Sequence, residues 1–181
     1  NNNNNNNING NKKSSLFASN VVITKKKPNW SPDGLFLCCV SGLTKNKKHG
    51  IHLFHRSNLF NKITTFSLNE LCHCSCIKWN PLLLKANNIE NNSIMFKYKM
   101  KYKMLFSCIC ENNIFILDTS KNNPILYWRD DDIQSFIDME WSFNGKILLL
   151  SDAEGFITKI TLNDDIINEY KPKKSMDLDN Q

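Results

Sequence analysis

Seven cysteines are the residues of this 181-residue chain best suited to chemistry, and five of them fall in two short runs. The first run alternates thiols with other residues over positions 72–76, and His73 lies between its first two cysteines. The second run places Cys108 and Cys110 two residues apart. Thiolates and imidazole are the usual ligands of zinc. The first run therefore raises a zinc hypothesis, which its spacing must decide.

The spacing disfavours zinc. Structural zinc sites use pairs of ligands separated by two to four residues that wrap around the ion. Alternation along a strand instead points Cys72, Cys74 and Cys76 to one face and His73 to the other. Free cysteine is among the most buried residue types. We therefore predict that these thiols pack in a core and that the chain holds no metal, with zinc binding and redox sensing as the alternatives.

The same cysteines bear on the class of protein. Their odd number, in a chain that shows no apolar leader, argues against a secreted disulfide framework. A reducing cytosol or nucleus is the expected compartment. The longest apolar runs, at residues 35–40 and 147–150, fall far short of the roughly 20 residues that a membrane-spanning helix needs. We therefore expect a soluble protein with no membrane partner.

Acidic residues are the second group that could do chemistry. Three consecutive aspartates, Asp130, Asp131 and Asp132, are followed by Glu154 and by further carboxylates up to residue 165. Paired carboxylates can act as general acid and base, but they need a pocket and perturbed pKa values, which three aspartates on a loop do not supply. The sequence has no phosphate-binding loop, nucleophile elbow or metalloprotease motif. We therefore predict that the protein is not an enzyme and uses no cofactor.

Charge divides unevenly along the chain. Residues 1–110 contain 16 Lys and Arg against 3 acidic residues, whereas residues 111–181 contain 7 basic and 14 acidic residues. A basic half and an acidic half are typical of a molecule that binds both acidic and basic partners. We predict that Asp130, Asp131, Asp132 and Glu154 lie on one exposed rim that binds a basic partner. The alternative is that these charges only solvate loops.

Residues 97–104 alternate lysines with aromatic residues and methionines. Cations interleaved with aromatic rings are typical of proteins that bind single-stranded nucleic acid. Period-two alternation also places the four lysines on one face and the tyrosines and methionines on the other, which predicts a half-buried strand. We favour the strand, so direct binding of nucleic acid is not expected.

The elements that must position these residues repeat along the chain. Residues 30–34 read WSPDG, residues 141–145 read WSFNG, and a truncated copy begins at Trp79. The three tryptophans are 49 and 62 residues apart, a little more than the roughly 40–45 residues of a WD repeat. Each Asp-Gly or Asn-Gly pair supplies the positive φ angles that a tight hairpin turn needs. Each unit is therefore predicted to end one strand on its tryptophan and turn into the next.

These signals predict an all-β fold, a WD-repeat β-propeller of which about three blades are visible. Four short strands in each repeat form a propeller blade. Trp30, Trp79 and Trp141 should occupy equivalent strand ends in three successive blades, and no helix should exceed about two turns. Further strands are predicted at residues 50–55, 63–66, 104–110, 114–117, 125–128 and 155–160.

Several longer stretches resemble a known family. Residues 102–106, 113–119, 137–142 and 151–156 are similar, nearly without gaps, to the final blades of the WD-repeat propeller subunit of chromatin assembly factor one. Residues 30–34 and 52–59 match the blade before. The resemblance covers roughly residues 16–165. The sister family of replication-independent histone regulators shares the same layout and is the nearest alternative.

The resemblance implies a seven-bladed ring, so this chain is expected to be a fragment with further sequence upstream. It also implies a nuclear, non-enzymatic subunit of a histone chaperone that acts in replication-coupled nucleosome assembly. The implied partners are the large subunit of chromatin assembly factor one, core histones three and four, and the chaperone anti-silencing function one, the last through a tail outside this chain. A general WD-repeat scaffold is the remaining alternative.

The predicted organisation follows from the repeat and from composition. The Asn-rich start cannot bury enough apolar surface to offset its chain entropy. The expected segments are a low-complexity linker at 1–15, a blade at 16–70, a second blade at 71–129 with a polar insertion near 85–101, a last blade at 130–170 and a tail at 171–181.

Overall fold

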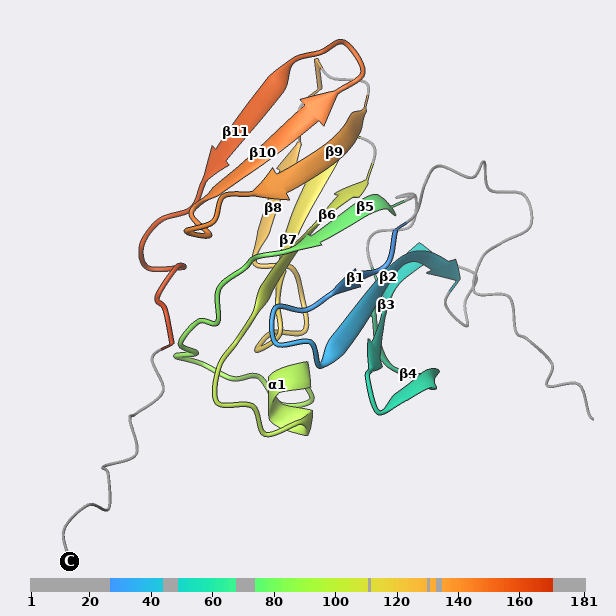
Figure 1. The fold of residues 1–181 in the computed structure, drawn as a ribbon, viewed down its shortest axis with the longest axis vertical. Coiled ribbons are helices and arrows are strands. Elements are labelled where there is room, and N and C mark those ends of the chain that lie inside the picture. The colour runs from blue at the N-terminus through green and yellow to red at the C-terminus, as the bar shows by residue number, and fades with distance from the viewer. Residues whose placement is uncertain are drawn as a thin grey trace, which may run out of the picture.

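A computed structural model describes residues 27–43, 49–67, 74–110, 112–129, 131–132 and 135–170. These residues form three antiparallel sheets and one short helix, and Figure 1 shows the sheets stacked one after another along the molecule. The predicted linker at 1–15 and tail at 171–181 lie outside the described residues. The boundaries of the three blades stay predictions.

In each sheet the strands are hydrogen-bonded to their neighbours in chain order. The first sheet contains β1 (Asn29–Trp30), β2 (Phe36–Leu43), β3 (His49–His55) and β4 (Asn58–Ser67). The second contains β5 (Cys74–Trp79), β6 (Leu105–Cys110), β7 (Asn113–Asp118) and β8 (Leu126–Arg129). The third contains β9 (Phe136–Trp141), β10 (Ile147–Asp152) and β11 (Ile157–Thr161).

This is the predicted all-β architecture of WD-type blades, and the prediction is confirmed. Each sheet is a meander of short antiparallel strands, which is the form of a propeller blade. Within the described residues the single helix, α1 (Ile94–Lys97), has four residues, in line with the predicted limit of about two turns. No helix in the described part of the chain is long and apolar enough to cross a bilayer.

Two apolar cores hold the three sheets together. The first lies between the first and second sheets, and the second lies between the second and third. The strands of the second sheet alternate between them, so Phe106 and Cys108 enter the first core while Leu105 and Ile109 enter the second. All six residues of β6 and all six of β7 are buried. The second blade is therefore covered on both faces by its neighbours.

The three repeat tryptophans occupy equivalent places. Trp30, Trp79 and Trp141 are each the last residue of the first strand of a sheet. The indole N–H of Trp79 donates to the carbonyl of Asn29 at 3.1 Å, and the indole N–H of Trp141 donates to the carbonyl of Lys78 at 3.3 Å. Asn29 and Lys78 each precede a repeat tryptophan. The rings of Trp79 and Trp141 therefore tie their blades to the equivalent position of the blade before.

The turns after Trp30 and Trp141 also repeat. Ser31 Oγ donates to Asp33 Oδ1 at 2.5 Å, and Ser142 Oγ donates to Asn144 Oδ1 at 2.8 Å. Only the glycine after each of these Asx residues has positive φ, at +69° and +67°. The pairs were predicted to supply the positive φ angles of the turn, and in each pair the glycine does so but the Asx residue does not. The side-chain hydrogen bonds stabilise a longer turn in which glycine alone is left-handed.

Residues 97–104 do not form the predicted strand. They begin with the last residue of α1, continue as a turn, and make one isolated bridge between Lys103 and Leu84. Ser93 caps the helix by accepting the N–H of Phe96 at 3.2 Å, and Lys99 has a φ of 50°. These local bonds override the period-two pattern. Met100 and Tyr102 nevertheless pack on the first core, as the alternation predicted for their side chains.

Candidate functional site

The turns gather at two opposite ends of the sheets. Asp152 pairs with Phe136, so the residues just before β9 and just after β10 leave the third sheet at the same end. Figure 1 places the β10–β11 turn at the top of the molecule and α1 at the bottom. The upper end is called the acidic rim here, for its residues Asp131, Asp132 and Glu154. The lower end, around α1, is called the helix rim.

The acidic rim holds three of the four residues predicted to bind a partner. Asp131, Asp132 and Glu154 are exposed, whereas Asp130 lies outside the described residues. Arg129 Nε lies 2.6 Å from Asp131 Oδ1, and both side chains are more than half exposed. The Asp131 carboxylate raises the pKa of Arg129 above its ordinary value. Because this pair is exposed, water and salt screen it strongly, and Asp131 keeps surface to offer to a partner.

Asp152 positions the acidic rim and does not form its surface. Its side chain is buried, and Asp152 Oδ1 accepts the backbone N–H groups of Glu154 and Phe156, both at 2.9 Å. Gly155, at φ +92°, completes the turn. The carboxylate of Glu154 is therefore carried on a short turn whose backbone is fixed by hydrogen bonds.

Other acidic residues of the third blade lie at the opposite end. Asp164 Oδ1 is 2.6 Å from Lys146 Nζ, and Leu162 N–H donates to the carbonyl of Lys146, the residue just before β10. Asp165 follows in the same exposed turn. The carboxylates that are close in sequence are thus divided between two ends of one blade.

The helix rim carries exposed lysines and aromatic rings. Lys97, Lys99 and Lys101 are exposed there. Beside them the rings of His55 and Tyr98 stack, with centroids 5.0 Å apart and an interplanar angle of 12°. Sequence reasoning misses this stack, because the alternation over residues 97–104 favours a strand. The sequence holds one signal for it, a serine at position 93 suited to cap a helix.

Lys103 has a different role from the other lysines of this segment. Its ammonium lies 3.1 Å from Asp118 Oδ2, and the Asp118 side chain is buried. Asp118 Oδ1 also accepts the N–H of Ser120 at 2.7 Å and its hydroxyl at 2.8 Å. Asp118 therefore fixes the turn after β7, and removing Lys103 takes away the ion-pair partner of a buried carboxylate.

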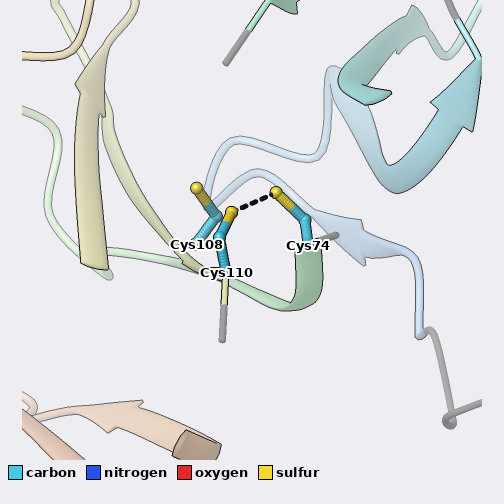
Figure 2. Close-up of side chains that lie close together, drawn as sticks. All are labelled: Cys74, Cys108 and Cys110. Carbon is cyan, nitrogen blue, oxygen red and sulfur yellow. Dashed lines mark hydrogen bonds between the residues drawn. The ribbon is translucent and has the colours of Figure 1, made fainter. Parts of the chain in front are cut away.

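Three cysteines from two strands of the second blade meet in the first core. The sulfur atoms of Cys74, Cys108 and Cys110 all lie within 4.8 Å of one another, and all three side chains are buried (Figure 2). Burial raises the pKa of Cys108 well above its ordinary value, and neighbouring thiols add to the effect. Cys74 packs in a core, as predicted from its residue type, and Cys108 and Cys110 pack there with it. Cys72 and His73 lie outside the described residues.

The prediction that Cys74 and Cys76 share one face of a strand is wrong. A β-bulge at this point pairs Cys74 with Cys110 but Cys76 with Ile109, so the side-chain alternation slips by one residue. Cys74 enters the first core, and Cys76 packs against the second. Cys76 Sγ donates to Asp138 Oδ1 at 3.4 Å. Burial first, and then the Asp138 carboxylate, raise the pKa of Cys76 to about 11.

Comparison with known proteins supports the resemblance found in the sequence. No protein-family model matches the chain. A chromatin assembly factor 1 subunit of Schizosaccharomyces pombe is 22% identical over 146 residues, which cover 75% of this chain and 28% of that protein. The chain resembles the propeller subunit of chromatin assembly factor 1. The chicken (Gallus gallus) counterpart, which carries the same name, is 21% identical over 156 residues, covering 77% of this chain and 26% of that protein.

Two further relatives carry related names. The chromatin assembly factor 1 subunit FAS2 homolog of Oryza sativa subsp. japonica is 24% identical over 162 residues, covering 83% of this chain and 30% of that protein. Protein HIR2 of Candida albicans is 26% identical over 130 residues, covering 72% of this chain and 12% of that protein. The chain therefore spans less than a third of the length of the curated relatives it matches.

Proposed function

We propose that this chain is a non-enzymatic, protein-binding part of a nuclear histone chaperone, and that it acts in replication-coupled nucleosome assembly by helping to deliver core histones three and four to DNA. The names of the relatives support the general role. The acidic rim supports a direct contact with a basic protein, because Asp131, Asp132 and Glu154 present exposed carboxylates at one end of the stacked blades.

Rigid support makes the rim suited to recognition. Asp152 and Gly155 fix the turn that carries Glu154, and the ladder of β9 and β10 pairs Asp152 with Phe136, at the end of the sheet that the chain enters after Asp132. Little conformational entropy is then lost when a partner binds. We propose that Asp130, which directly precedes Asp131 in the sequence, takes part in the same histone contact.

Exposed carboxylates act mainly on the rate of association. Charge pairs at a wet surface contribute little free energy, and their fields fade over about 8 Å at physiological salt. They do steer an oppositely charged partner before contact, which raises the association rate at low salt. The proposed histone contact should therefore appear in the salt dependence of binding more than in the affinity.

The test compares two matched double variants of the full chain. One is Asp131→Asn with Asp132→Asn on the acidic rim, and the other is Asp164→Asn with Asp165→Asn at the opposite end. Each removes two neighbouring carboxylates, and the first of each couple has an ion-pair partner at 2.6 Å. Binding of purified histones three and four is followed by stopped-flow fluorescence over a range of salt concentrations.

We expect the rim variant to bind roughly three- to tenfold more slowly at low salt and to show a flatter salt dependence. The control should stay close to the unmodified chain. Equal rates for all three proteins would mean that Asp131 and Asp132 only solvate a loop. Equal slowing in both variants would mean that net charge, and not the rim, attracts the histone.

The similarity to HIR2 supports a second candidate, a replication-independent histone regulator. The replication-coupled and replication-independent candidates predict different binding partners for this chain. Recovery of the large subunit of chromatin assembly factor one from nuclear extract would favour the replication-coupled role. Recovery of a replication-independent regulator complex without that subunit would favour the second candidate.

A further inference from the structure

We propose that Cys74 and Cys110 are a redox site in the second blade, which stays as two thiols under reducing conditions and closes to a disulfide under oxidising ones. The site lies inside the first core, at the same end of the second blade as Arg129, since Cys110 pairs with Asn113 and Asn113 pairs with Arg129. The inference does not depend on the proposed histone function.

Strand register brings these two cysteines together. Cys74 is the first residue of β5 and pairs directly with Cys110, the last residue of β6. Their sulfur atoms are 2.6 Å apart in a thiol hydrogen bond, and Figure 2 shows the two side chains pointing at each other from the two strands. Residues directly opposite in an antiparallel pair have β-carbons about 4.5–5.5 Å apart, close to the spacing that a disulfide accepts.

A metal is the competing occupant, because Cys108 supplies a third sulfur to the cluster. Three thiolates around one divalent ion would leave a net negative charge inside the first core. The residues packed there are apolar, with Phe66, Phe106 and Phe115 among them. Structural zinc sites use four protein ligands and include sets of four thiolates, so this charge does not by itself exclude zinc. The cluster found among the described residues supplies three sulfur atoms, one short of such a set, whereas a disulfide needs only the facing pair.

The chemistry balances with a low-molecular-weight disulfide, such as oxidised glutathione, as the oxidant. The Cys74 thiolate attacks one sulfur of the oxidant, forms a mixed disulfide and releases one glutathione. Cys110 then loses its proton and attacks the Cys74 sulfur, which releases the second glutathione. Two protein thiols lose two electrons and two protons, and the oxidant becomes two thiols. Local opening at the end of β5 is the expected route of access, because strand ends open at lower cost than strand centres.

Peptide mapping of the full chain tests the site directly. The protein is equilibrated in glutathione buffers of increasing oxidised fraction, the remaining thiols are alkylated, and the cross-linked peptides are identified by mass spectrometry. We expect two of the seven thiols to disappear together, with the bond between Cys74 and Cys110. The bond encloses a long loop, so the melting temperature should rise by about 5–10 °C on oxidation.

Variants and zinc provide the controls. Cys108→Ser should keep the bond and the rise in melting temperature, whereas Cys110→Ser should lose the rise. The mapping of the unmodified chain stands even if Cys110→Ser does not fold. Reduced protein that leaves Cys74 and Cys110 unbonded at every glutathione ratio overturns the proposal. Stoichiometric binding of zinc that requires Cys74, Cys108 and Cys110 and blocks oxidation also overturns it.

Discussion

A methyl group added at Gly145 tests how the second and third blades meet. Gly145 has a φ of +67°, and a β-carbon at this position would lie 2.6 Å from Asn80 Oδ1 and 2.9 Å from Leu82 Cδ1. Asn80 is fully buried, and its Nδ2 donates to the Gly145 carbonyl at 2.7 Å. A side chain at position 145 must therefore displace the residues of the second blade that hold this turn.

The expected loss for Gly145→Ala combines two costs. A left-handed backbone costs an alanine about 1–2 kcal/mol. Displacement of close-packed neighbours adds about 1–3 kcal/mol. The free energy of unfolding should therefore fall by about 2–5 kcal/mol. Gly34→Ala is the matched control, since Gly34 has nearly the same φ, +69°, but its β-carbon would lie 3.6 Å from the nearest atom, on flexible Arg56. The control should lose only the backbone cost.

Urea unfolding of the full chain, followed by tryptophan fluorescence, measures both variants. The difference between their losses isolates the contact between blades. Losses equal to within about 0.5 kcal/mol would refute the inference that Gly145 is pressed against Asn80. In a double-mutant cycle, Asn80→Ala should cost less in the Gly145→Ala background than alone, because it then also removes the atom that the new methyl group crowds.

Three further predictions follow from single contacts. Trp141→Phe should lower the free energy of unfolding by about 1–3 kcal/mol in urea melts, because it removes the indole hydrogen bonds to Lys78 and Ser107. Trp30→Phe should lower the free energy of unfolding less, because the Trp30 side chain is half-exposed. Burial and then the hydrogen bond to Asp33 raise the pKa of Tyr102 to about 12, so the native state holds this proton more tightly than the unfolded chain. The stability that this contributes is complete below about pH 10 and is lost as the pH rises towards 12. Tyr102→Phe should remove the latest phase of a tyrosinate absorbance titration. Asp138→Asn should lower the pKa of Cys76 from about 11 and speed its alkylation at pH 9; an unchanged rate would mean that burial alone protects this thiol.

Much of the blade architecture could be predicted because its signals are local. Strand alternation and turn residues act over a few positions, and the spacing of Trp30, Trp79 and Trp141 reports the repeat directly. The bonds that the indoles of Trp79 and Trp141 make to the preceding blade could not be predicted, since they join residues 50 and 63 positions apart. The repeat indicated which residues are equivalent, and packing decided what they touch.

Two local patterns mislead because stronger bonds compete with them. The alternation over residues 97–104 gives way to the Ser93 cap and the left-handed Lys99. The alternation of Cys74 and Cys76 is broken by a bulge, which forms only when β5 pairs with β6. Met100, Tyr102 and Met104 do pack inward, as the alternation predicted, but Tyr98 is exposed and the backbone is not a strand.

The sequence alone determined the fold class, the repeat and the presence of acidic residues and clustered thiols. Tertiary structure decided which of these lie together. Strand direction places Asp131, Asp132 and Glu154 at one end of the third blade and Asp164 at the other, although all are close in sequence. Register brings Cys74 beside Cys110, 36 positions away. Residue types fix what chemistry is possible, but only the pairing of strands fixes which side chains come within reach of one another.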